Sequence, residues 1–145
     1  MIVIDANSLV KLAITEEHSE DAYAAVYAAT ASKEPIVAPD IILAEALNAI
    51  WVSFAKKRRI TAAQCESAEG TITMIFNEIQ AIPTRELARL AMGLAKEHDL
   101  TLYDALYASA SVVNNAPLLT FDGRLRERAS DIGIEIVGNK RHPKA

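Results

Sequence analysis

The chain has 145 residues, of which 51% are hydrophobic and 23% are charged, a composition typical of a soluble globular protein with one domain. Its net charge of −4 argues against a nucleic-acid binder that works by bulk positive charge. The single cysteine excludes an intrachain disulfide, and the three isolated histidines lack metal-ligand spacing. No signal peptide and no apolar run of roughly 20 residues is present, so we expect a cytoplasmic protein without membrane contact.

The predicted elements alternate between short strands and longer helices. In chain order, the apolar or β-branched runs predict strands at 1–4, 36–38, 78–82, 118–120 and 134–137. Amphipathic or alanine-rich stretches predict helices at 9–14, 16–31, 40–59, 62–77, 84–98, 101–114 and 124–131. We expect Asp40 and Thr61 to be the N-caps of the third and fourth helices. This alternation predicts an α/β fold with three layers, α/β/α, around a central parallel sheet of four to five short strands. Residues 1–137 form the predicted single domain, and 138–145 a basic, flexible tail.

Two aspartates are expected at the carboxyl ends of parallel strands, the edge at which open α/β sheets bind their ligands. Asp5 follows the first strand and Asp122 follows the strand at 118–120. Each also has a purely structural interpretation. Asp5 can cap the following helix, as can Asn7 or Ser8, and Asp122 can be a turn residue before a glycine.

Two further acids lie on predicted helices. Glu45 is surrounded at helical spacing by apolar residues and lies several residues past the expected cap, so its inward carboxylate needs an arginine or a cation as a partner. Asp104 follows Thr101 by three residues, which is the spacing of a capping box, and capping alone can explain it. Tyr103 and Tyr107 are expected to pack in the core, with stacking on a base as the alternative.

The four acids gain meaning when they are taken together. Four carboxylates in one crevice repel one another unless cations offset their charge. Oxygen ligands without histidine or cysteine favour hard cations such as Mg²⁺ or Mn²⁺, which promote attack on phosphate esters. These four negative charges equal the net charge of −4, so the rest of the chain is neutral. The net charge therefore excludes a nucleic-acid binder less strongly than it does at first sight.

Four segments of the chain resemble, in order, the motifs of PIN domains, and specifically those of the VapC-type toxin ribonucleases. They are Ile2-Val-Ile-Asp-Ala-Asn-Ser8, Pro39-Asp-Ile-Ile-Leu-Ala-Glu45, Leu100-Thr-Leu-Tyr-Asp-Ala-Leu-Tyr-Ala108 and Leu118-Leu-Thr-Phe-Asp122. No segment alone is specific, but the ordered set spans nearly the whole chain.

The resemblance implies a PIN-like fold and a Mg²⁺- or Mn²⁺-dependent endoribonuclease that hydrolyses RNA phosphodiesters. The catalytic and metal-binding acids it implies are Asp5, Glu45, Asp104 and Asp122. Behind these ligands, the residues expected to orient the ligand oxygens are Asn7, Ser8 and Thr120. The partners it implies are RNA, a VapB-like antitoxin and a second copy of the chain in a homodimer.

Competing functions fit the sequence less well. A catalytically silent PIN-like module that binds RNA or protein is the main alternative, although such modules usually lose one or more of the acids. A phosphatase of the haloacid-dehalogenase type wants a second aspartate two positions after the first, where Asn7 stands. A nucleotide-binding fold lacks its Gly-rich loop here, and a serine hydrolase lacks its nucleophile elbow.

Overall fold

The computed structural model describes residues 1–138, which contain a parallel sheet of five short strands. The strands are β1 (Ile2–Ile4), β2 (Ile36–Pro39), β3 (Gln80–Ile82), β4 (Leu118–Leu119) and β5 (Ile136–Val137). Their order across the sheet is β3-β2-β1-β4-β5, and each neighbouring pair is parallel. The two strands that are followed by predicted site aspartates, β1 and β4, are therefore adjacent.

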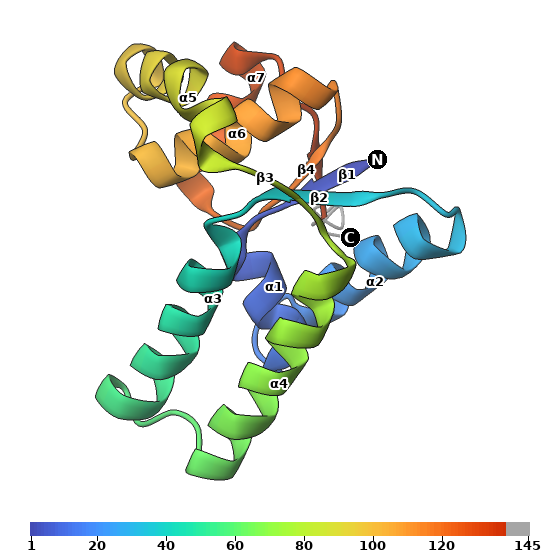
Figure 1. Ribbon diagram of the computed structural model, residues 1–145, viewed down its shortest axis with the longest axis vertical. Coiled ribbons are helices and arrows are strands. Elements are labelled where there is room, and N and C mark those ends of the chain that lie inside the picture. Colours follow the sequence, from blue (N-terminus) through green and yellow to red (C-terminus); the bar gives the residue numbers. More distant parts are fainter. Residues whose placement is uncertain (139–145) are drawn as a thin grey trace, which may run out of the picture.

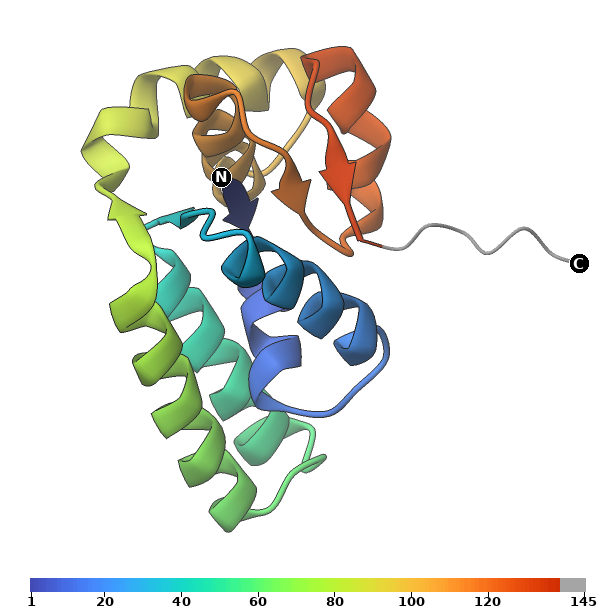
Figure 2. The same cartoon turned by 90° about the vertical axis from the view of Figure 1, so that its right-hand side faces the viewer.

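Helices cover both faces of the sheet (Figure 1). On one side lie α5 (Thr84–His98), α6 (Leu102–Asn114) and α7 (Gly123–Ile132). The other side carries α1 (Ala6–Ala13), α2 (Ser19–Ala31), α3 (Ile42–Trp51) and α4 (Ala62–Glu78). A π-helical turn, η1 (Val52–Lys56), continues α3, and α3 and α4 run antiparallel as an arm directed away from the sheet (Figure 2). The predicted α/β/α architecture is confirmed.

The hydrophobic core follows the two central strands. Ile4 of β1 and Leu118 and Leu119 of β4 are completely buried, because helices cover both faces of these strands and their apolar runs need no polar side. Helix α6 contacts β1, β2 and β4 and buries Leu106 against them. This packing fixes α6 relative to the sheet edge at which the acids lie. Among residues 1–138, none of the helices combines the length and the apolar character that crossing a bilayer requires.

The third helix begins later than the sequence predicts. It starts at Ile42, without a side-chain cap, because the backbone N–H of Asp40 still donates to the carbonyl of Ile82 in the neighbouring strand (2.8 Å). The expectation that Asp40 is the N-cap was wrong. Its carboxylate instead accepts hydrogen bonds from the backbone N–H (3.1 Å) and the hydroxyl (2.6 Å) of Thr84. Asp40 thus joins the end of β2 to the start of α5.

Two other helix boundaries also differ from the prediction. Helix α2 starts at Ser19 and not at residue 16, because His18 before it has a left-handed backbone with a φ of 66°. The helix that was expected to reach residue 59 ends at Lys56, since Arg58 has a φ of 50°. The N-cap at Thr61 is confirmed by a complete capping box with Gln64. Residues 139–145, which make up almost all of the predicted tail, lie outside the described residues.

Candidate active site

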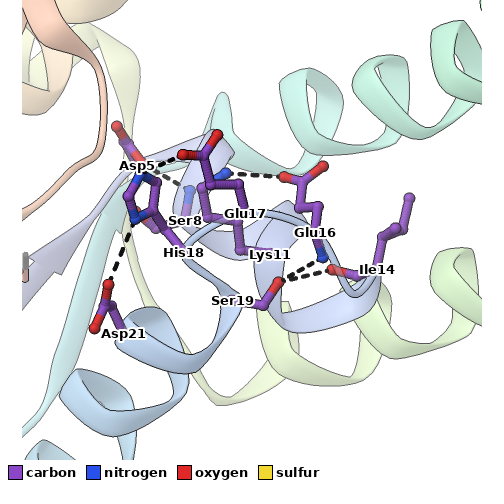
Figure 3. Close-up of polar contacts among 9 residues, drawn as sticks. All are labelled: Asp5, Ser8, Lys11, Ile14, Glu16, Glu17, His18, Ser19 and Asp21. Atoms are coloured by element: carbon purple, nitrogen blue, oxygen red, sulfur yellow. Dashed lines mark hydrogen bonds and ion pairs between the residues drawn. The ribbon is translucent and has the colours of Figure 1, made fainter.

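Asp5 lies directly after β1 and is the N-cap of α1. Its Oδ1 accepts a hydrogen bond from the backbone N–H of Ser8 (2.8 Å; Figure 3), and its Oδ2 accepts one from the hydroxyl of Thr120 (2.5 Å). Only 5% of the residue is exposed. Asp5 therefore caps α1 through Oδ1 and contacts the residue that follows β4 through Oδ2. Its predicted capping and its predicted place at the carboxyl end of β1 are both confirmed.

Thr120, which follows β4, connects two of the acids, Asp5 and Asp122. Its buried hydroxyl donates to Asp5 and accepts from the backbone N–H of Asp122 (3.1 Å). Asp122 is the N-cap of α7, with its Oδ1 accepting from the backbone N–H of Leu125 (2.9 Å). The hydroxyl of Ser8 donates to the carbonyl of Leu119 (2.9 Å). Side chains thus hold the ends of β1 and β4 together in addition to the strand pairing.

Asp104 lies in the first turn of α6, and its backbone N–H donates to the hydroxyl of the N-cap residue Thr101 (3.1 Å). In a complete capping box the side chain at this position bonds back to the cap backbone, as Gln64 does to Thr61 (2.8 Å). Within the described residues, the Asp104 carboxylate makes no such bond. The cap's hydrogen bond is made by the backbone N–H of Asp104, and within residues 1–138 the carboxylate, whose pKa the Thr101 side chain lowers, does not close the capping box. This weakens the interpretation of the residue as a cap alone.

Glu45 reaches across from α3 to α6, where its Oε1 accepts a hydrogen bond from the phenolic hydroxyl of Tyr107 (2.9 Å). Because α3 begins only at Ile42, Glu45 lies in its first turn. The expectation of a position well past the helix start was wrong, and the helix dipole favours this carboxylate. Its observed partner is a neutral phenol. Among residues 1–138, no arginine or lysine forms a salt bridge with it.

Burial and mutual repulsion disfavour the ionised forms of Asp5, Glu45 and Asp104. Burial is the main cause that raises the pKa of Asp5, Glu45 and Asp104 above the ordinary values. The negative charge of Asp122 further raises the pKa of Asp5 and of Asp104, and the charges of Asp104 and Asp5 further raise that of Glu45. The hydrogen bonds from Thr120, Ser8, Tyr107 and Thr101 act in the opposite direction. The four carboxylates therefore form one electrostatic unit.

The nearby arginines do not neutralise this unit. Arg124 lowers the pKa of Asp104, but its side chain is 51% exposed and forms its salt bridge with Asp99. Arg126 donates from Nε to the carbonyl of Thr120 (2.8 Å) and from Nη2 to the carbonyl of Gly138 (2.7 Å). Within the described part of the chain, no salt bridge joins a lysine or arginine to any of the four acids. Among residues 1–138, their combined negative charge is therefore not neutralised by a salt bridge.

The α1–α2 loop packs beside the strand end that carries these acids. The imidazole of His18 stacks on the ring of Phe121, with centroids 5.2 Å apart and planes 7° from parallel. His18 itself lies 3.5 Å from the carboxylates of Glu17 and Asp21 (Figure 3). Because Phe121 stands between Thr120 and Asp122 in the chain, this stack helps to fix the position of both neighbours.

Comparison with known proteins agrees with this geometry. The PIN domain family model matches residues 2–130. The chain belongs to the PIN domain family. It is similar to Ribonuclease VapC3 of Pyrobaculum aerophilum, with 27% identity over 127 residues that cover 88% of this chain and 93% of that protein.

Two solved structures share the fold of this PIN domain. The first is VapC20 of Mycobacterium tuberculosis, a toxin that cleaves the sarcin-ricin loop, with a TM-score of 0.67, 16% identity and coverage of 96% of this chain and 100% of that chain. The second is VapBC2 of Rickettsia felis, bound to a DNA fragment from their promoter, with a TM-score of 0.59, 22% identity and coverage of 94% and 96%. Both likenesses concern the fold.

The donor set of this PIN domain fits a hard divalent cation, since it consists of carboxylates that form no salt bridge within residues 1–138. Among residues 1–138, no three histidine, cysteine or acidic side chains form a preassembled metal cluster. The site therefore fits such an ion by its chemistry and its charge, and not by a closed cage of ligands.

The residues predicted to stand behind the acids differ in what they contact. Thr120 bonds directly to Asp5. Ser8 holds Asp5 through its backbone, while its hydroxyl bonds to a strand carbonyl. Asn7 is exposed, and its orienting role stays a prediction. Tyr107 is buried as predicted, whereas Tyr103 is 55% exposed and its predicted core packing was wrong. The contact of Tyr107 with Glu45 was not predicted. The available signal was the position of Tyr107 three residues after Asp104, on the same helix face.

Proposed function

We propose that this PIN domain is a Mg²⁺- or Mn²⁺-dependent endoribonuclease and the toxin of a VapBC-type toxin–antitoxin pair. The observation that carries the proposal is the mutual electrostatic repulsion of four carboxylates, from Asp5 and Asp122 after β1 and β4, Glu45 of α3 and Asp104 of α6. Three of them have raised pKa values, and within residues 1–138 none forms a salt bridge. Such a group costs stability unless a cation offsets it. The likeness to Ribonuclease VapC3 supports RNA as the substrate and a VapB-like protein as the partner.

In this proposal, Asp5, Asp104, Asp122 and Glu45 are the residues that would hold the ion. A bound Mg²⁺ or Mn²⁺ supplies positive charge to a phosphoryl oxygen and lowers the pKa of water at the site. The protein's own contribution is to orient the carboxylates. Thr120 fixes Oδ2 of Asp5, while the burial of Asp5 keeps bulk water away from it. The backbone N–H of Ser8 holds Oδ1 of Asp5, and we propose that Asn7 orients a ligand oxygen beside it.

We also propose an oligomeric state and a cellular compartment for this protein. We include a homodimer, supported by the exposed apolar side chains of Trp51, Phe54 and Met74 on the arm formed by α3, η1 and α4. Light scattering coupled to size-exclusion chromatography measures this directly, and a monomer at all concentrations would remove it. An RNA substrate and a lone cysteine support the cytoplasm as the compartment.

Cleavage of a structured RNA by the purified protein tests the proposed activity. We expect cutting in Mg²⁺ or Mn²⁺ and none in EDTA. Asp104→Asn, folded by circular dichroism, should abolish cutting, because it removes the negative charge and keeps the backbone N–H that bonds to the capping Thr101. Asp131→Asn is the matched control, since Asp131 is an exposed acid on α7. A folded wild type that binds RNA but neither binds metal nor cuts would refute the enzyme and support the silent binding module.

A further inference from the structure

We propose that the phenolic hydroxyl of Tyr107 holds the Glu45 carboxylate in the orientation that receives the cation, which makes Tyr107 a positioning residue of the site. This inference rests on the proposed function, because it assigns Tyr107 a role toward the same ion. The two residues are 62 positions apart in the chain and meet through a hydrogen bond of 2.9 Å between α6 and α3.

The surroundings of Tyr107 suit it to this role. Its side chain is almost completely buried, with 2% of the residue exposed, on a helix that packs against β1 and β2. Glu45 is only partly buried and lies on α3, so its side chain needs a fixed point of attachment. Within residues 1–138, the Tyr107 hydroxyl is the side-chain group that donates to the Glu45 carboxylate. A rigid donor thus holds one oxygen of a more mobile acid.

The chemistry of the donor matters as much as its position. A phenol is neutral and has one O–H to donate, so it fixes Oε1 and leaves Oε2 without that constraint. An arginine in its place would neutralise Glu45 and occupy both oxygens. Because Tyr107 adds no positive charge, the site keeps its full negative charge for a cation. Groups that orient ligands in this way typically contribute about 10–100-fold to metal affinity.

Helix α6 combines two of the functions of the site in one turn. Asp104 supplies a carboxylate, and Tyr107, three residues later, lies on the same helix face and holds the carboxylate that α3 supplies. The relative placement of Glu45 and Asp104 is therefore set by one rigid helix. This explains how acids from α3 and α6 are kept together although their helices belong to opposite layers (Figure 1).

Calorimetric titration of the full chain with Mn²⁺ tests the inference without measuring cleavage. We expect Tyr107→Phe to weaken Mn²⁺ binding by about 10-fold or more, with an unchanged circular dichroism spectrum. Tyr27→Phe is the matched control, because it deletes the same hydroxyl from a side chain on α2 that is 76% exposed. It should bind Mn²⁺ as the wild type does.

A double-mutant cycle with Glu45→Ala, which removes the acceptor of the Tyr107 hydroxyl, separates positioning from a general structural effect. If Tyr107 acts through Glu45, the change Tyr107→Phe weakens binding in the wild type but not in the Glu45→Ala background. An equal loss in both backgrounds, or no loss in the wild type, overturns the inference while leaving the proposed enzyme in place. A wild type that binds no Mn²⁺ overturns the metal site itself, and this inference with it.

A second variant covers a loss of folding in Tyr107→Phe. Glu45→Asp keeps the charge but withdraws the carboxylate from Tyr107 by one methylene. Glu45→Asp should weaken Mn²⁺ binding by about 10-fold or more. Mn²⁺ binding at the wild-type level would overturn the inference.

Discussion

Replacing Glu45 by glutamine should stabilise the metal-free protein while weakening its response to a cation. The carboxylate is partly buried and is repelled by Asp104 and Asp5. A glutamine keeps the acceptor for the Tyr107 hydroxyl and removes the charge. The native residue therefore lowers the stability of the empty site, and we expect the substitution to reveal this cost directly.

The size of the effect follows from the contacts of Glu45. Each of its two repulsive pairs costs about 0.2–0.5 kcal/mol at a partly exposed helix position. With the desolvation of the charge, the expected gain in the free energy of unfolding is about 1 kcal/mol, or about 4 °C in melting temperature for a chain of this size. Because the pKa of Glu45 is raised above 4.5 in the folded state, the gain is fully present above that folded pKa. It disappears as the pH falls through the folded pKa toward 4.5.

Thermal melting with and without Mn²⁺ measures both parts of this prediction. In EDTA, the wild type should have a lower melting temperature than Glu45→Gln. In Mn²⁺ this difference should become smaller or change sign, because a ligand at 100 times its dissociation constant stabilises the protein by about 2.7 kcal/mol. Glu69→Gln, at an exposed position of α4, should change the stability by less than about 0.5 kcal/mol. A clear loss of stability for metal-free Glu45→Gln at neutral pH would refute the argument from repulsion.

Other substitutions distinguish the site from the scaffold. Thr120→Val removes a donor to Asp5 and the acceptor for the backbone N–H of Asp122, so urea unfolding should show a free energy of unfolding lower by about 1–3 kcal/mol. Calorimetry should show weaker Mn²⁺ binding, and unchanged binding would count against the role of Thr120. Thr61→Ala should cost about 1 kcal/mol through loss of the capping box, with RNA cleavage unaffected. Mn²⁺ affinity should fall as the pH is lowered, and the fall should start at a higher pH than for ordinary carboxylates, because three of the acids have raised pKa values. A constant affinity down to pH 4 would contradict those shifts.

The sequence predicted the features that depend on local chemistry. The short apolar runs marked β1 and β4, and parallel pairing then placed Asp5 and Asp122 at one edge. The capping box at Thr61 was equally visible, because both partners lie within one turn of helix. Such patterns are complete within a few residues and need no tertiary information.

Features that depend on contacts between distant segments could not be predicted in this way. Asp40 looked like an N-cap, but its partner is Thr84, 44 positions away. The contact between Glu45 and Tyr107 also joins two helices from different layers. Neither partner carries a signal that names the other, since the tertiary fold alone brings them together. The late start of α3 has the same origin, because the strand pairing of Asp40 extends past the point at which local preference favours a helix.

The double use of Asp5 and Asp122 has a consequence for how relatives of this chain can diverge. Each residue is a helix N-cap as well as a member of the acidic group, and capping accepts aspartate, asparagine or serine almost equally. A lineage freed from selection for catalysis would still be held to those residue types at positions 5 and 122. Position 104 carries no such obligation, since the hydrogen bond to the capping Thr101 hydroxyl comes from the backbone N–H, which residues other than acids also supply. An acid retained at 104 is therefore better evidence of a working enzyme than the acids at the two caps.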